Sequence, residues 1–170
     1  MKEPNVQLKN VKTFEGHEGL GINADVWING LKCMHLYDSA MGGEYEYTYF
    51  TYNNPKAGQV RENIALLEAY IKTLPPEVTI MNDREFTLDV DMDMFLNEIY
   101  EKMQMEKKMK KSILVGVPNA TVYEVYGWKN TPLANIPVPS LQKAVDDLKS
   151  QCTGGKVILN TNLETLGVTL

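Results

Sequence analysis

The chain has 170 residues, of which 44% are hydrophobic and 23% are charged, and its formal net charge at pH 7 is -5. This is an ordinary globular composition without a broad basic face, so we expect no duplex nucleic acid as a partner. No apolar run approaches the roughly 20 residues of a membrane span, and the first residues lack a signal-peptide pattern. We therefore expect a cytoplasmic protein with no membrane partner.

The first third of the sequence has the pattern of an antiparallel sheet. Residues 5–14 are strand-like, and residues 22–28 alternate apolar and polar side chains with the period of a half-buried strand. Asn29-Gly30 follows directly and predicts a type I′ hairpin turn, because both central residues of that turn need a positive φ. A four-strand meander is then completed by a strand over 31–37, a loop over 38–43 and a strand over 44–52.

Helical patterns dominate the middle of the chain. Apolar residues at spacings of three and four predict a helix from Asn54-Pro55 to about Thr73, and Pro75-Pro76 ends it. A second helix over about 91–111 starts with aspartates and ends with lysines, as the helix dipole favours. The other predicted segments are a short strand near 78–81 or 85–90, strands over 113–117 and 121–126, a loop over 127–139, a helix carrying residues 141–152 and a strand over 157–160.

These segments indicate the α+β class. We expect an N-terminal antiparallel β-meander with helices packed on it, followed by a C-terminal unit of β-hairpin, helix and strand. The chain is interpreted as a single domain over residues 1–170, with two lobes over 1–76 and 91–170 as the alternative. Unpaired sheet edges make a homodimer a reasonable assembly.

One acidic motif resembles the start of a calcium loop. Asp89, Asp91 and Asp93 have the alternate spacing of an EF-hand, but Met94 replaces its glycine and Tyr100 its glutamate. We therefore predict that these aspartates begin a helix rather than bind calcium.

Other catalytic and metal motifs are incomplete as well. Cys33 and His35 would share one strand face, yet no second pair of ligands stands at zinc spacing. We expect no metal, no cofactor and no catalytic residue. The candidate acid and base groups, which usually form the solvated face of a sheet, are Asp25, Asp38, Glu44 and Glu46.

Ligand binding is indicated by aromatic residues and by a glycine-rich segment. Tyr45, Tyr47 and Tyr49 would share a face and offer flat rings to a purine, although strands also favour tyrosine for packing beneath helices. The backbone of residues 16–21 could cradle an anion, and the loop at Trp128 is either a binding lid or a plain connection. The predicted ligand-binding residues are Gly16, His17, Gly19, Gly21, Trp27, Tyr45, Tyr47, Tyr49, Arg61, Trp128 and Lys129.

Several short blocks resemble those of small accessory proteins carried by bacteriophages. This resemblance spans most of the chain, and it brings no assigned activity. It implies a setting in which the protein interferes with host defence, by sequestering a nucleotide signal or by occluding a host protein. The blocks are Asn23-Ala24-Asp25-Val26-Trp27, Asp38-Ser39-Ala40-Met41-Gly42-Gly43, Gly116-Val117-Pro118 and Ile158-Leu159-Asn160-Thr161-Asn162-Leu163.

The expected function is non-enzymatic binding of a nucleotide-type signalling molecule, as in a phage counter-defence factor acting in the host cytosol. Such a protein needs stacking planes and anion donors but no activated nucleophile, which agrees with the incomplete catalytic motifs. The alternative is an inhibitor that binds a host protein. A carboxylate-based hydrolase comes third.

Overall fold

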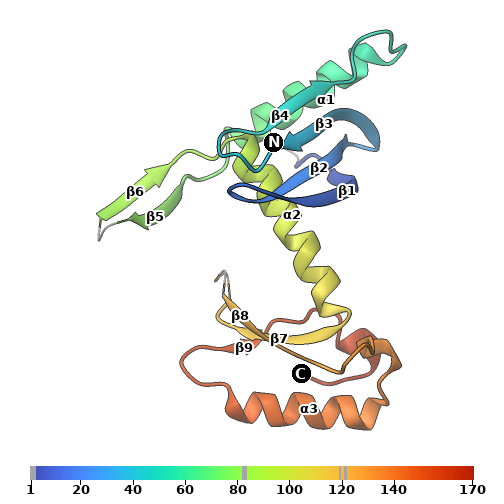
Figure 1. Ribbon diagram of the computed structural model, residues 1–170, viewed down its shortest axis with the longest axis vertical. Helices are drawn as coiled ribbons and strands as arrows, with labels where there is room; N and C mark the ends of the chain where they lie inside the picture. The colour runs from blue at the N-terminus through green and yellow to red at the C-terminus, as the bar shows by residue number, and fades with distance from the viewer. Residues whose placement is uncertain (1–2, 82–83, 119, 121) are drawn as a thin grey trace. The chain divides into compact units, whose positions relative to one another are not determined.

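The computed structural model describes residues 3–81, 84–118, 120 and 122–170. The chain divides between Tyr100 and Glu101 into two compact units, and each is described by itself. Both units combine strands with helices, so the predicted α+β class is confirmed (Figure 1). Within the described ranges, no helix has the length and apolar character needed to span a bilayer.

The first unit is built on the predicted four-strand meander, in which each strand pairs with the next along the chain. The last strand is shorter than the predicted 44–52, because residues 50–52 form a turn and the backbone N–H of Tyr45 donates to a carboxylate oxygen of Asp93 at 2.8 Å. Tyr45 therefore leaves the sheet. The strands are β1 (Val6–Gly16), β2 (Gly19–Ile28), β3 (Leu31–Asp38) and β4 (Glu46–Tyr49).

The turn between β2 and β3 has the predicted type I′ character. Asn29 and Gly30 have φ angles of 51° and 79°, the left-handed values that this turn requires. The side chain of Asn29 also accepts a hydrogen bond from the backbone N–H of Asn5 and donates one to Asn63. The turn thus links the first strand, the sheet and the following helix.

We expect Gly30→Val to lower the free energy of unfolding by more than about 1 kcal/mol, because a β-branched residue is strained at positive φ. A Cβ atom at this position would have no neighbour within 4 Å outside the adjacent residues, so the cost is one of backbone conformation. Urea unfolding measures it. Gly58→Ala is the control: it lies in a helix at an ordinary φ with open space around it, and it should not destabilise. An unchanged Gly30→Val variant would contradict the turn.

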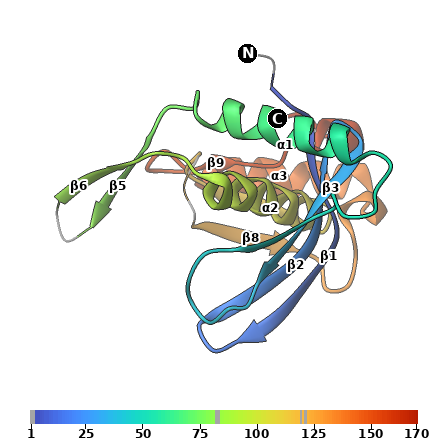
Figure 2. The ribbon, with the colours of Figure 1, turned by 90° about the horizontal axis from the view of Figure 1, so that it is seen from above.

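Helix α1 (Ala57–Ile71) covers one face of this sheet and lies beside β3 (Figure 2). The residues at the predicted apolar spacing form its buried side, and they are Val60, Ile64, Leu67 and Ile71. Helix α2 (Met92–Met109) begins in the first unit, where the ring of Phe95 meets that of Tyr70 edge-on.

Between these helices, both candidate segments form strands, and they pair with each other. β5 (Glu77–Met81) and β6 (Arg84–Leu88) make an antiparallel hairpin that projects from the rest of the first unit (Figure 1). All five side chains of β6 are exposed. Short strands without a buried face have no clear periodicity, which is why the sequence marks them poorly.

The second unit contains a three-stranded sheet in the order β8-β7-β9 and helix α3 (Val138–Gln151). The helix starts before Pro139, earlier than predicted, because proline is well tolerated in a first helical turn. The strand predicted over 121–126 begins at residue 121, which lies outside the described residues. The strands are β7 (Ser112–Gly116), β8 (Tyr123–Gly127) and β9 (Val157–Ile158).

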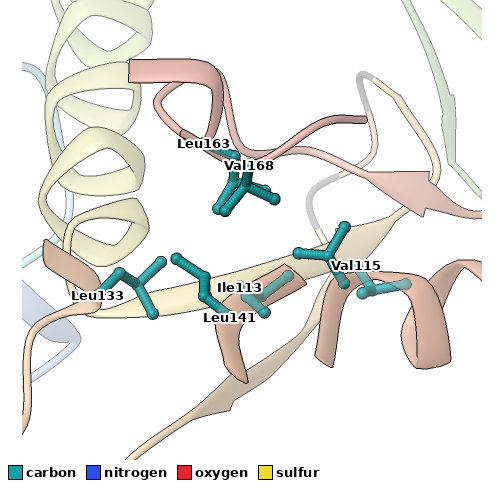
Figure 3. Packing of buried hydrophobic residues seen from close by; sticks show 7 residues of the cluster. Ile113, Val115, Leu133, Leu141, Leu163 and Val168 are labelled. Carbon is teal, nitrogen blue, oxygen red and sulfur yellow. The ribbon is translucent and has the colours of Figure 1, made fainter. Parts of the chain in front are cut away.

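A compact apolar cluster holds the second unit together (Figure 3). It joins β7, α3, the loop between β8 and α3, and the C-terminal segment. Leu133 in this loop is fully buried, and its backbone N–H donates to the carbonyl of Lys110 at 3.0 Å. The buried members are Ile113, Val115, Leu133, Leu141, Val145, Leu163 and Val168.

Candidate ligand-binding face

The two faces of the four-stranded sheet differ in chemistry. The apolar residues of β2 are buried on the face that α1 covers, and strand alternation places the intervening residues on the opposite face. We call this second surface the open face. Its residues come from all four strands and the segment directly after β4, and they are Gln7, Lys9, Lys12, Phe14, Gly21, Asn23, Asp25, Trp27, Lys32, His35, Tyr37, Glu46, Thr48 and Phe50.

At one end of the open face, two aromatic rings each have a lysine ammonium over the ring. The ammonium of Lys9 lies 4.0 Å from the ring centre of Trp27, and that of Lys32 lies 4.3 Å from the ring centre of Phe50. Trp27 and Lys32 are direct partners across β2 and β3. The indole N–H of Trp27 is buried and has no acceptor among the described residues. This end therefore combines flat rings, positive charge and an unsatisfied donor.

A buried carboxylate organises the middle of the open face. Asp25 Oδ1 lies 2.8 Å from Lys32 Nζ and 3.0 Å from His35 Nδ1, and its Oδ2 accepts a hydrogen bond from Asn10 at 2.8 Å. Burial alone would raise the pKa of Asp25, but the bonds from Lys32, Asn10 and His35 outweigh it and lower the pKa to about 2. Asp25 therefore stays charged and fixes the side chains around it.

We expect Asp25→Asn to lower the free energy of unfolding by about 2 kcal/mol at pH 7, since one pKa unit corresponds to about 1.4 kcal/mol. The native pKa of about 2 lies below the ordinary 3.8, so this stabilisation is complete above about pH 4 and is lost as the pH falls toward 2. Urea unfolding across that range should show the deficit shrinking. Glu46→Gln, on an exposed residue of the same sheet, is the control. A deficit independent of pH would contradict this role.

The expectation that Cys33 and His35 share a strand face is wrong. The pairing of β2 with β3 shifts at Cys33, because Val26 pairs with Met34 and Trp27 with Lys32. Cys33 is fully buried on the helix-covered side, and its sulfur lies 3.9 Å from Asn63 Nδ2 of α1. His35 instead contacts Asp25 on the open face, so the two side chains cannot bind one zinc ion.

The predicted tyrosines lie on the side of the helices. The hydroxyl of Tyr47 donates to Asp93 in α2 at 2.5 Å, and that of Tyr45 donates to Asn97 at 3.4 Å. Burial and the Asp93 carboxylate raise the pKa of Tyr47. Tyr49 pairs with the buried Met34 and remains 44% exposed. The packing alternative therefore describes Tyr45 and Tyr47 better than a stacking surface does.

The predicted glycine-rich segment is a tight hairpin turn. Gly16 pairs with Gly19, and the backbone N–H of Glu18 donates to the carbonyl of Ala40 at 2.8 Å, so this amide is already used. His17 lies exposed at the turn. At about 3.3 Å per residue, the eight positions of β2 separate Gly19 from Trp27 by roughly 26 Å. The structure does not bring this turn and Trp27 together.

Three further predicted residues lie elsewhere. Arg61 is exposed on α1. Trp128 and Lys129 belong to the second unit, where Trp128 bridges to Thr131 around a turn in which Asn130 has a φ of 56°. This segment is a tight turn rather than a long lid. Gly21, the remaining glycine of the predicted set, is covered by the ring of Phe14, which occupies the space of a side chain.

Asp91 and Asp38 have structural partners. Asp91 accepts a hydrogen bond from the backbone N–H of Met94 at 2.8 Å, so it caps α2 as predicted. Asp38 accepts one from Ala40 at 2.9 Å. Among the described residues, no group of three or more His, Cys, Asp and Glu side chains could hold a metal ion.

The sequence interpretation missed most of the open face. Lys9, Asn10, Lys32, His35 and Phe50 were not recognised as parts of the surface around Trp27 and Asp25. Part of the signal was available, because the Asn-Gly turn and strand alternation place Lys32 across from Trp27. No protein-family model, curated protein or solved structure matches this chain.

Proposed function

We propose that this is a non-enzymatic binding protein whose open face holds a nucleotide-type ligand. The observation that carries the proposal is the pair of rings, Trp27 and Phe50, each with a lysine ammonium about 4 Å above it. Flat rings and ammonium groups side by side provide the two contacts that a nucleotide needs, stacking for the base and positive charge for the phosphate.

The ligand would exchange places with the ammonium of Lys9. A base that stacks on Trp27 displaces the ammonium of Lys9, which then becomes free to bind a phosphate. Lys12 is exposed, and within the described part of the chain no carboxylate pairs with its ammonium. The unsatisfied indole N–H of Trp27 gains an acceptor if the ligand brings one. His35, whose Nδ1 faces Asp25, retains Nε2 for a further polar contact.

Binding without turnover agrees with the state of the acidic groups. Asp25 is held by Lys32, His35 and Asn10, and a carboxylate with a pKa of about 2 is a poor general base at neutral pH. Within the proposal, the ligand is therefore sequestered and released unchanged. The resemblance to phage accessory proteins suggests the setting: removal of a nucleotide signal from host defence in the host cytosol.

The test is a thermal-shift screen with AMP, ATP, GTP, cyclic di-AMP and cyclic GMP-AMP, followed by chromatography of the nucleotide after heat denaturation. We expect at least one nucleotide to raise the Tm, because binding to the folded state alone stabilises it. That nucleotide should be recovered intact. No shift with any member would overturn nucleotide binding, and recovery of a changed nucleotide would overturn the non-enzymatic role.

A second candidate function is inhibition of a host protein, and the β5–β6 hairpin favours it. Val78, Phe86 and Leu88 are 61%, 45% and 47% exposed on this projecting element. Phe86 and Leu88 share one face, and Val78 lies on the other. Under this alternative, no nucleotide shifts the Tm, and Phe86→Ser with Leu88→Ser abolishes inhibition of host defence while the Trp27→Ala variant retains it.

A further inference from the structure

We propose that the second unit carries a separate pocket for a weakly hydrated organic cation, such as a quaternary ammonium or guanidinium group. The pocket has a volume of about 290 Å³ and lies between the end of β8 and α3. It belongs wholly to the second unit, so it is independent of the open face. Its lining includes Ile113, Tyr126, Trp128, Ala144, Asp147 and Leu148.

The aromatic walls favour a cation. Tyr126 and Trp128 are 38% and 36% exposed, so each offers part of its ring to a ligand. The hydroxyl of Tyr126 donates to Glu124, which also pairs with Lys156, and these contacts hold the tyrosine in place. The electron-rich faces of such rings attract positive charge.

The charge of the pocket also favours a cation. Asp147 is exposed, and its carboxylate takes no hydrogen bond or ion pair from the part of the chain that the structure describes. None of the described lining residues is basic. An unpaired carboxylate beside two aromatic rings attracts a cation and disfavours an anion.

The remaining walls select the kind of cation. Ile113, Ala144 and Leu148 provide apolar surface that cannot replace the water around a primary ammonium. Guanidinium and quaternary ammonium groups are more weakly hydrated and lose less when they enter such a site. The group could belong to a free small molecule or to a modified or arginine side chain of another protein.

The experiment uses the full chain with Trp27→Phe, which leaves Trp128 as the single tryptophan of the two in the sequence. Its fluorescence is followed during titration with choline and, separately, with the uncharged isostere 3,3-dimethyl-1-butanol. A short peptide containing trimethyllysine provides the second arm. If the Trp27→Phe chain does not fold, the indole N–H signal of Trp128 in the NMR spectrum of the unaltered chain gives the same measurement.

We expect saturable binding of choline that is about 10-fold or more tighter than that of the alcohol, as expected for a partly desolvated cation on aromatic rings. Asp147→Asn should weaken choline several-fold, whereas Asp146→Asn, its exposed neighbour on α3 outside the pocket lining, should not. Tighter binding of the peptide than of choline would identify a protein side chain as the source. Equal affinity for choline and the alcohol, or no effect of Asp147→Asn, would overturn the proposal.

Discussion

Replacing Trp27 by alanine is expected to weaken binding of the nucleotide found in the screen by about 5- to 150-fold. Stacking of one base on an aromatic ring contributes about 1–3 kcal/mol, and each 1.4 kcal/mol is a factor of ten. Trp27→Phe should lose much less, because it keeps a flat ring. Isothermal titration calorimetry at fixed ionic strength measures all three proteins.

Tyr49→Ala is the matched control for this prediction. Tyr49 is also an exposed aromatic residue of the same sheet, but it lies on the helix-covered side. Its removal should leave the affinity unchanged. Lys9→Gln should weaken binding less than Trp27→Ala does, because it removes charge and leaves the ring. If Tyr49→Ala weakens binding and Trp27→Ala does not, the ligand occupies the tyrosine side and the open face is not the site.

The second large effect is expected at Asn160, which is 2% exposed in the second unit. Its Oδ1 accepts a hydrogen bond from the backbone N–H of Leu114 at 2.6 Å. Its Nδ2 donates to the carbonyls of Met109 at 3.2 Å and Ser112 at 2.9 Å. Asn160 thereby fastens the C-terminal segment to the end of α2 and the start of β7.

Asn160→Asp should lower the free energy of unfolding of the second unit by about 2–4 kcal/mol. The carboxylate oxygen that replaces Nδ2 would lie buried against the two carbonyl oxygens and would have no N–H to donate to them. Urea unfolding followed by Trp128 fluorescence in the Trp27→Phe background measures this unit. Asn135→Asp makes the same chemical change at an exposed position and should have little effect. Equal stability of the two aspartate variants would show that the Asn160 bonds contribute nothing.

Part of the fold follows from local sequence alone. The Asn29-Gly30 turn, the alternation of β2 and the apolar spacing of α1 each depend on residues near one another in the chain, so their patterns predict the elements directly. Asp91 at the start of α2 is of the same kind, since its capping bond spans three residues. The β5–β6 hairpin could be predicted only in part, because its exposed β6 strand shows no hydrophobic period.

The candidate site was decided by contacts between strands. The sequence identified Trp27, but it could not show that Lys9 from β1 lies over that ring. Nor could it show that the fourth strand turns Tyr47 toward Asp93, 46 positions further along. The shift in pairing at Cys33 changes which face a side chain occupies, and such a bulge leaves no clear mark in hydrophobic periodicity.

The sequence by itself determined the α+β class, the meander and the positions of its main turn and helices, because short-range backbone preferences and the burial of apolar side chains specify them. Only the tertiary structure decided which face of the sheet is open, which carboxylates are engaged and how Asn160 joins distant segments. Those features depend on strand register and on partners far apart in the chain. Neither is encoded in the order of neighbouring residues.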